Sequence, residues 1–230
     1  MEDFFLVLAV IYNDLKGLIH LEKDFMDNHV PPTSGTPSAY LGEYNGMTTQ
    51  LYKTLAGLVN EFFVFLKEHE KLYKEPRFQL MFLKMAPSVG KEWEGILDAA
   101  LERPDSKKPG TLGYRLLRVR NDVAFHYYKS EKVLREAFQE FFNDETRPNA
   151  DFAYYSFGEN MQDTRFYYAD AAVQRYLMKT ASTEGAPNYA KDIVALQDFQ
   201  SETFKLVRSM NIVLANMLRR FITMRHEAKI

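Results

Sequence analysis

The stretch LQDFQSETFKLVRSMNIVLANM, residues 196–217, carries the most regular pattern in this chain. Its core positions recur at alternating steps of three and four residues, at Leu196, Phe199, Thr203, Leu206, Met210, Val213 and Met217. Side chains at this spacing share one face of an α-helix, as the core positions of a helical bundle do. We therefore expect a long helix that runs from about Tyr189 nearly to the end of the chain.

The same period recurs from the N-terminus onward. It predicts a helix over residues 3–27, a long second helix over 41–72, and shorter helices over 78–85 and 88–101. Prolines and a glycine in residues 30–37 predict a loop between the first two helices. Two helices of this length indicate a bundle.

Capping signals and a change of period organise the second half. Thr111 is placed to cap a helix that begins at Leu112, and a further helix is expected over residues 130–141. Aromatic residues on both sides of a Gly-Glu-Asn turn suggest the two strands of a small β-hairpin within residues 150–170: Phe152, Tyr154 and Phe157 before the turn, and Phe166, Tyr167 and Tyr168 after it. Asp170 is then placed to cap a helix that runs through Met178. The expected fold is all-α: a bundle of long antiparallel helices, with a hairpin insertion, in one domain over residues 1–230.

Composition narrows the classes of function. The 230 residues are 46% hydrophobic, contain no cysteine, and carry a formal net charge of −2. A near-neutral chain has no bulk attraction for nucleic acid or an anionic membrane, so any such contact needs a local patch. The absence of cysteine fits a reducing compartment, and we expect a cytoplasmic protein. The apolar run at residues 4–11 is too short to span a bilayer, so no membrane association is expected.

Several common catalytic motifs are absent from the sequence. It has no phosphate-binding loop, no dinucleotide fingerprint and no nucleophile elbow. None of His20, His29, His69 and His226 has the spacing of a helical di-iron site or a zinc protease. We expect no metal and no cofactor.

One stretch gathers chemistry that the rest of the chain lacks: RLLRVRNDVAFHYYKS, residues 115–130. Arg120, Asn121, Asp122 and His126 supply a permanent cation, polar side chains and a base that titrates near neutrality. Arginine can hold a phosphodiester and histidine can move the proton of an attacking or leaving oxygen. No metal is required where the nucleophile is a ribose 2′-hydroxyl.

The geometry of an ideal helix separates the two main candidates. Six residues advance the helix by about 600°, which leaves Arg120 and His126 about 120° apart. Either the helix loosens near His126, or a homodimer brings two arginines and two histidines into one composite site.

Local charge offers a second reason to consider RNA. Eight basic residues but only two acidic ones, Asp122 and Glu131, lie in residues 107–135. Electrostatic contact with RNA would concentrate there, with Arg118, Asp122 and Lys129 as further substrate-binding candidates. The alternative is that these residues form ordinary solvated helix faces.

The pattern Arg120-Asn121-(x4)-His126-Tyr127-Tyr128 resembles the motif of the HEPN family: an arginine, a polar residue, a histidine four to six residues further on, and a tyrosine two residues beyond it. The resemblance implies a helical bundle that dimerises through this region and cleaves RNA without metal. Such proteins occur in toxin–antitoxin and abortive-infection systems. Arg120, His126 and Asn121 would be the catalytic residues. In some members a partner nucleotidyltransferase antitoxin modifies the tyrosine, which would be Tyr128 here.

Two other interpretations stay open on the sequence. Arg120 could pair with a neighbouring acid while His126 simply ends a helix, in a non-catalytic binding or scaffold protein that dimerises or binds a partner or nucleotide. The chain could also be the regulated half of a pair that is modified on Tyr128. The aromatic residues between 152 and 168 could stack on RNA bases, or they could pack in the core or at an interface.

Overall fold

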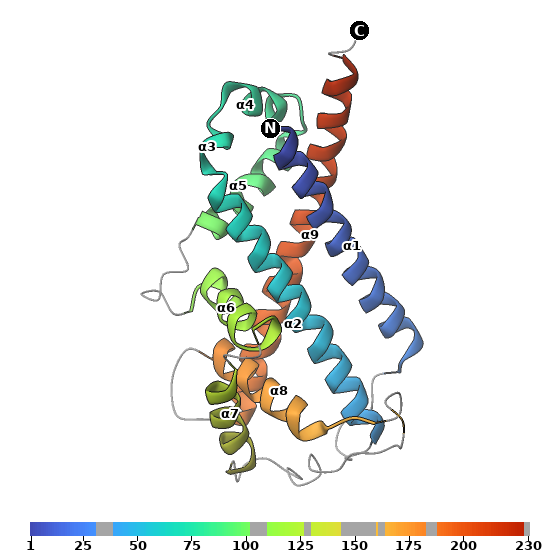
Figure 1. Ribbon diagram of the computed structural model, residues 1–230, viewed down its shortest axis with the longest axis vertical. Helices are drawn as coiled ribbons and strands as arrows, with labels where there is room; N and C mark the ends of the chain where they lie inside the picture. The colour runs from blue at the N-terminus through green and yellow to red at the C-terminus, as the bar shows by residue number, and fades with distance from the viewer. Residues whose placement is uncertain are drawn as a thin grey trace.

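Three long helices form the frame of the molecule in the computed structural model, which describes residues 1–30, 39–101, 110–126, 130–143, 160, 164–182 and 188–227. They are α1 (Glu2–Asn28), α2 (Ala39–Glu68) and α9 (Tyr189–Glu227). Figure 1 shows that α2 and α9 run in the opposite sense to α1. With 39 residues, α9 is about 58 Å long and extends along most of the molecule.

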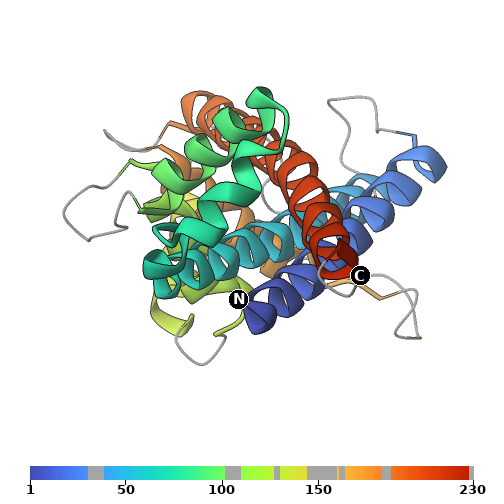
Figure 2. The same cartoon turned by 90° about the horizontal axis from the view of Figure 1, so that it is seen from above.

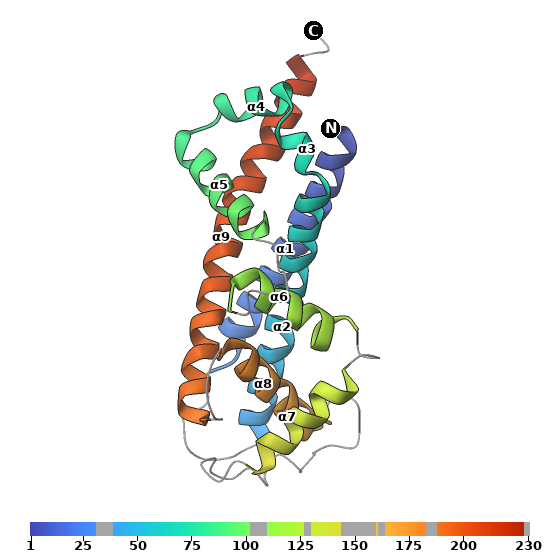
Figure 3. The same ribbon diagram turned by 90° about the vertical axis from the view of Figure 1, so that its left-hand side faces the viewer.

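Short helices cover one end of this frame. They are α3 (Glu70–Tyr73), α4 (Pro76–Leu83) and α5 (Pro87–Leu101), and they lie near the N-terminus of α1 and the C-terminal half of α9 (Figure 3). Both α4 and α5 begin with proline, whose missing N–H is no loss in the first turn of a helix. Seen from above in Figure 2, α1 and α9 cross beside these helices.

The opposite half of the frame carries the helices of the candidate site. These are α6 (Leu112–Val119), the π-helical turn η1 (Arg120–Ala124), α7 (Glu131–Asn143) and α8 (Tyr167–Ala181). Both α6 and η1 pack on α2, α7 packs on α8, and α8 packs on α2 and α9. The motif is therefore held against the middle of a long core helix.

A single cluster of buried apolar side chains connects the two halves. It includes Leu8 of α1, Phe62 of α2, Leu116 of α6, Leu177 of α8 and Met210 of α9, all at most 1% exposed. Residues at this depth each contribute roughly 1.5–3 kcal/mol relative to an exposed position. Six of the seven periodic residues of the C-terminal helix are buried, as their spacing predicts, but Leu206 is only partly buried and its neighbour Val207 takes the core position.

The all-helical prediction is confirmed in the described part of the chain, which contains no strand. Helix bounds agree with the expected ranges to within a few residues at most ends. The Thr111 cap is also confirmed, because the Thr111 hydroxyl accepts a hydrogen bond of 3.3 Å from the Tyr114 N–H.

Two expectations around residue 165 are wrong. Tyr167 and Tyr168, expected in the second strand of the hairpin, begin α8, while residues 152–157 lie outside the described residues. Asp170 does not cap the helix but lies in its first turn. The Asp170 carboxylate instead accepts hydrogen bonds from Arg165, from Nε at 2.6 Å and from Nη2 at 3.1 Å. This forked, charge-assisted pair outweighs a cap as a partner for the carboxylate.

The outer face of α1 is apolar in part. Leu6, Val10 and Leu21 are each more than half exposed, and α1 is long and apolar enough to cross a membrane by length and composition alone. Its inner face, with Phe4, Phe5 and Leu15, is buried in the bundle. A core helix of a soluble protein passes the same test of length and composition.

Candidate functional site

The site is built on a change of helix type at the end of α6. From Arg120 to Ala124 the backbone continues as a π-helix, and the Phe125 N–H donates to the Arg120 carbonyl at 3.3 Å, five residues back. Phe125 then leaves the helix with φ −125° and ψ −11°. A π turn holds more residues than an α turn, and such turns often occur at functional sites.

This turn brings Arg120 and His126 into direct contact. Arg120 Nη1 lies 2.6 Å from His126 Nε2 and 2.8 Å from Asn121 Oδ1. A guanidinium only donates hydrogen bonds, so His126 Nε2 is the acceptor and the matching neutral tautomer has its proton on Nδ1. The sequence left two ways to bring Arg120 and His126 together, a loosened helix end or a homodimer. The structure of the single chain contains the loosened helix end.

A third side chain reaches the arginine from α2. Arg120 Nε donates to Glu61 Oε1 at 2.5 Å, with the Arg120 side chain 28% exposed and that of Glu61 41% exposed. The pair is open to solvent, so its contribution to stability is modest. It nevertheless fixes the direction of the guanidinium, whose Nη1 faces Asn121 and His126.

Gly57, one turn before Glu61, lets the π turn approach α2 closely. A Cβ atom added at Gly57 would lie 2.6 Å from Phe125 Cε2 and 3.3 Å from Ala124 Cβ. Real Cβ atoms essentially never show the shorter of these distances. The glycine that weakens α2 in terms of helix propensity therefore allows this packing.

Ser130 anchors the chain beyond His126. It is 2% exposed, and its hydroxyl donates to the Asp122 carbonyl and lies 3.3 Å from the His126 carbonyl. The exit of the chain is thereby tied back to the π turn. Tyr128 and Lys129, the candidates for modification and substrate binding, lie outside the described residues.

The side chains of Arg118 and Asp122 lie toward α8, away from Arg120 and His126. Asp122 Oδ2 lies 2.8 Å from Arg118 Nη2 and accepts a hydrogen bond of 2.5 Å from the Tyr176 hydroxyl. Burial raises the pKa of the Tyr176 hydroxyl, and the bond to Asp122 raises it further. Arg118 and Tyr176 also line a second cavity of about 250 Å³. The two residues are thus not joined to the Arg120–His126 contact.

The local positive charge expected for residues 107–135 is largely offset. Every described basic residue of this segment has a carboxylate partner: Arg115 with Glu202, Arg118 with Asp122, Arg120 with Glu61, Lys132 with Glu136, and Arg135 with Glu131. Glu61, Glu136 and Glu202 lie outside the counted segment, so a count along the sequence cannot include them. The motif is less basic than the sequence suggests.

Sequence reasoning missed Glu61, Gly57 and Ser130. Glu61 and Gly57 are about 60 residues away from the motif, and no local pattern links them to it. Ser130 is the last residue of the stretch 115–130, but nothing in the sequence around it predicts that its side chain is buried.

The described residues contain no group of three or more His, Cys, Asp and Glu side chains placed to hold a metal ion. No protein-family model, no curated protein and no solved structure matches this chain. The contacts around Arg120 therefore carry any functional argument.

Proposed function

We propose that this chain is a metal-independent endoribonuclease of the HEPN type, a toxin or defence-system component that acts as a homodimer. The observation that carries the proposal is the 2.6 Å contact between Arg120 Nη1 and His126 Nε2 at the π turn. A cation and a base in direct contact can act on the same phosphodiester, the cation on its phosphate oxygens and the base on the neighbouring hydroxyl.

The proposed reaction is an internal transesterification. When the phosphate takes the Nη1 donor of Arg120, His126 Nε2 is released and takes the proton of the ribose 2′-hydroxyl, whose oxygen attacks the adjacent phosphorus. A bond forms between O2′ and phosphorus, and the bond from phosphorus to the 5′-oxygen of the next nucleotide breaks. A general acid protonates that leaving oxygen, so the products are a 2′,3′-cyclic phosphate and a 5′-hydroxyl. Arg120 neutralises the charge that grows on the phosphate oxygens.

One histidine cannot hold the leaving oxygen while it takes the proton of the attacking one, which lies on the opposite side of phosphorus. A second copy of the chain would bring another His126 as the acid. The Arg120 side chain is 28% exposed, so a phosphate can reach it. Asn121, which accepts from Arg120 Nη1, is the positioning residue for this arginine.

RNA cleavage in the presence of EDTA tests this function. We expect cleavage by the wild type and a loss of at least about 100-fold in Arg120→Ala and in His126→Ala, the range for a lost acid–base or electrostatic group. Arg208→Ala and His20→Ala, two exposed positions on α9 and α1, are matched controls that keep full activity. Undiminished cleavage in both site variants, or strict metal dependence, contradicts the proposal.

A second function is favoured by the Glu61–Arg120 ion pair. An arginine already bound to a carboxylate is a normal structural element, and the chain would then be a non-catalytic helical protein that dimerises or binds a partner or nucleotide. This alternative predicts that purified wild-type protein cleaves no RNA with or without metal. It also predicts that Arg120→Ala lowers the free energy of unfolding as its main effect.

A further inference from the structure

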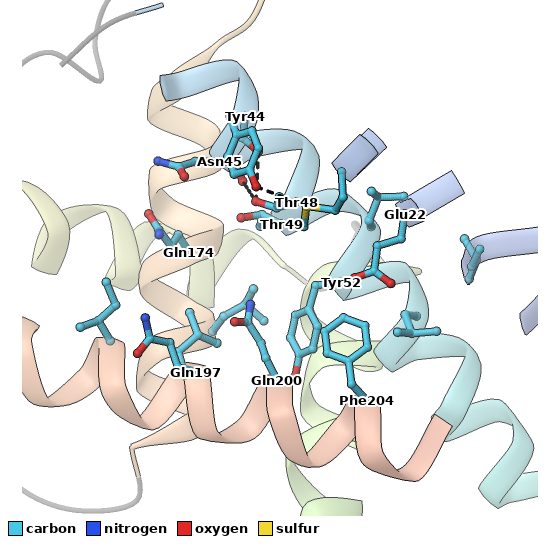
Figure 4. A pocket seen from close by; sticks show the side chains of 17 residues that line it. Glu22, Tyr44, Asn45, Thr48, Thr49, Tyr52, Gln174, Gln197, Gln200 and Phe204 are labelled. Atoms are coloured by element: carbon cyan, nitrogen blue, oxygen red, sulfur yellow. Dashed lines mark hydrogen bonds between the residues drawn. The ribbon is translucent and has the colours of Figure 1, made fainter. Parts of the chain in front are cut away.

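A cavity separate from the arginine site lies between α1, α2, α8 and α9. Its volume is about 370 Å³, within the range of small-molecule sites. Figure 4 shows Gln197 and Gln200 on α9 directed toward the same space as Gln174 on α8, with Glu22 on the far side. Four helices that are distant in sequence thus contribute to one concave surface.

The polar part of this surface consists mainly of side-chain amides. Asn45, Gln174, Gln197 and Gln200 each offer a carbonyl acceptor and two N–H donors. Within the described part of the chain, none of these four amides has a hydrogen-bond partner. By contrast, the Thr48 hydroxyl already donates to the Tyr44 carbonyl at 3.0 Å. The amides are therefore available for a ligand.

The rest of the lining is apolar and aromatic. Leu55, Leu177 and Leu196 are buried side chains of the core, and the rings of Tyr52 and Phe204 stand beside one another in Figure 4. A flat apolar body fits against such rings, while its polar edge meets the amides.

The charge of the residues that line the cavity restricts the chemical class of ligand that it can bind. Among the described residues that line the cavity, Glu22 is the only one with a carboxylate, and none is a lysine, arginine or histidine. Partial burial raises the pKa of the Glu22 carboxyl, so an N–H donor beside it would relieve its loss of hydration. A phosphate would meet no cation and one carboxylate, which disfavours any phosphorylated ligand.

From these features we infer that the cavity binds a planar heterocycle with an amide or amidine edge and no phosphate, such as a nucleobase or its nucleoside. The amides recognise the donors and acceptors of the edge, Glu22 accepts from an amino group, and the aromatic rings cover a face. This site is independent of the proposed ribonuclease site, because it shares none of that site's residues.

Isothermal titration calorimetry with the full chain tests the inference. The probes are adenosine, guanosine, cytidine and uridine, each compared with its 5′-monophosphate. We expect at least one nucleoside to bind with one-to-one stoichiometry and to raise the Tm, and its monophosphate to bind about tenfold more weakly. No binding by any nucleoside at millimolar concentration overturns the inference, as does a monophosphate that binds as tightly as its nucleoside.

Variants locate the binding. Gln174→Ala and Gln200→Ala, which truncate the two half-buried glutamines, should each weaken nucleoside binding about three- to tenfold. Gln50→Ala, an exposed glutamine of α2 outside the cavity, is the matched control and should bind as the wild type does. Glu22→Gln should narrow the difference between nucleoside and monophosphate. An unchanged Tm without ligand shows that each variant folds, and unchanged affinity in both glutamine variants overturns the inference.

Discussion

Arg120 has polar partners from three places in the chain: Glu61 on α2, its neighbour Asn121, and His126 beyond the π turn. Each partner accepts a hydrogen bond, because a guanidinium has five N–H donors and no acceptor. The motif residues were found in the sequence because arginine, asparagine and histidine are chemically distinctive at that spacing. Glu61 was not, because an acid on a helix 59 residues earlier looks like any other surface glutamate.

Glu61 both directs Arg120 and competes with a phosphate for it. Glu61→Gln keeps an acceptor for Arg120 Nε but removes the negative charge, so we expect RNA affinity to rise up to about fivefold, the range of a partly exposed ion pair. Glu61→Ala removes the acceptor too and should lower the cleavage rate. Fluorescence anisotropy measures the affinity, and single-turnover cleavage measures the rate. Weaker RNA binding by Glu61→Gln than by the wild type would contradict this role.

Gly57 is the residue whose change should disturb the π turn with little effect on stability. Alanine favours a helix by about 1 kcal/mol over glycine, but its Cβ would overlap the Phe125 ring, which is 46% exposed and can move away. We expect Gly57→Ala to displace Phe125 and the neighbouring His126. The free energy of unfolding should change by less than about 1 kcal/mol, while RNA cleavage falls.

Two comparisons isolate this effect. Gly17→Ala, where nothing lies within 4 Å of the added Cβ, should stabilise the protein by about 0.5–1 kcal/mol and leave the His126 NMR signals unchanged. Adding Phe125→Ala to Gly57→Ala removes the overlap, so the double variant should give the same His126 signals as Phe125→Ala alone. Identical His126 signals in Gly57→Ala and the wild type would show that the glycine is not needed for the π turn.

At the scale of elements, the sequence predicts the long helices well and the π turn not at all. The bounds of α1 and α9 follow from a period of three and four residues that continues over many turns. A π turn of five residues is too short to change that period visibly. Its close contacts are with Gly57 and Ser130, which no periodic pattern marks. The hairpin was wrong at Tyr167 and Tyr168 because aromatic residues favour strands only weakly, and here they pack as the first turn of α8.

The ion pair between α8 and α9 is the strongest candidate for a polar contact that holds these elements together. Arg175 Nη1 lies 2.6 Å from Asp192 Oδ2, and the two side chains are 2% and 8% exposed. Asp192→Ala would leave a buried guanidinium with Glu140 as its remaining acid, at 3.4 Å. We expect the free energy of unfolding to fall by about 3 kcal/mol.

Urea denaturation measures this loss, with the m-value checked for two-state unfolding. The control is Glu131→Ala, which removes an exposed pair with Arg135 and should change the free energy of unfolding by less than about 0.5 kcal/mol. A double variant, Arg175→Met with Asp192→Leu, should recover part of the stability because no charge stays buried alone. A loss in Asp192→Ala as small as that in the control would rule out a structural role for the pair.

At the scale of the whole molecule, three buried tyrosines link stability to alkaline pH. Burial raises the pKa of Tyr52, Tyr73 and Tyr176 above the ordinary value of 10.0. Below pH 10 each of these tyrosines is neutral in the folded and in the unfolded protein, so its burial contributes fully to the free energy of unfolding. Above pH 10 the unfolded chain loses these protons first, and the free energy of unfolding falls as pH rises.

Urea denaturation at a series of pH values, with tyrosinate absorbance recorded in parallel, checks this dependence. Tyr52→Phe should reduce the slope above pH 10, because one buried hydroxyl no longer titrates on unfolding. Ionisation of all tyrosines near pH 10 with the fold intact would contradict the prediction.

Dimerisation is the property of the whole molecule on which the proposed activity depends. If each active site draws Arg120 and His126 from two copies, Arg120→Ala and His126→Ala homodimers lack both arginines or both histidines. A mixed dimer keeps one arginine and one histidine but lacks the second histidine, the proposed acid. We therefore expect the mixture, after subunit exchange, to cleave RNA faster than either variant alone but more slowly than the wild type. Light scattering establishes the mass of the assembly, and equal mixtures of wild type with each variant control for dilution. Because Arg120 and His126 already touch within one chain, cleavage by a monomeric wild type would show that one copy suffices and that the dimer is unnecessary.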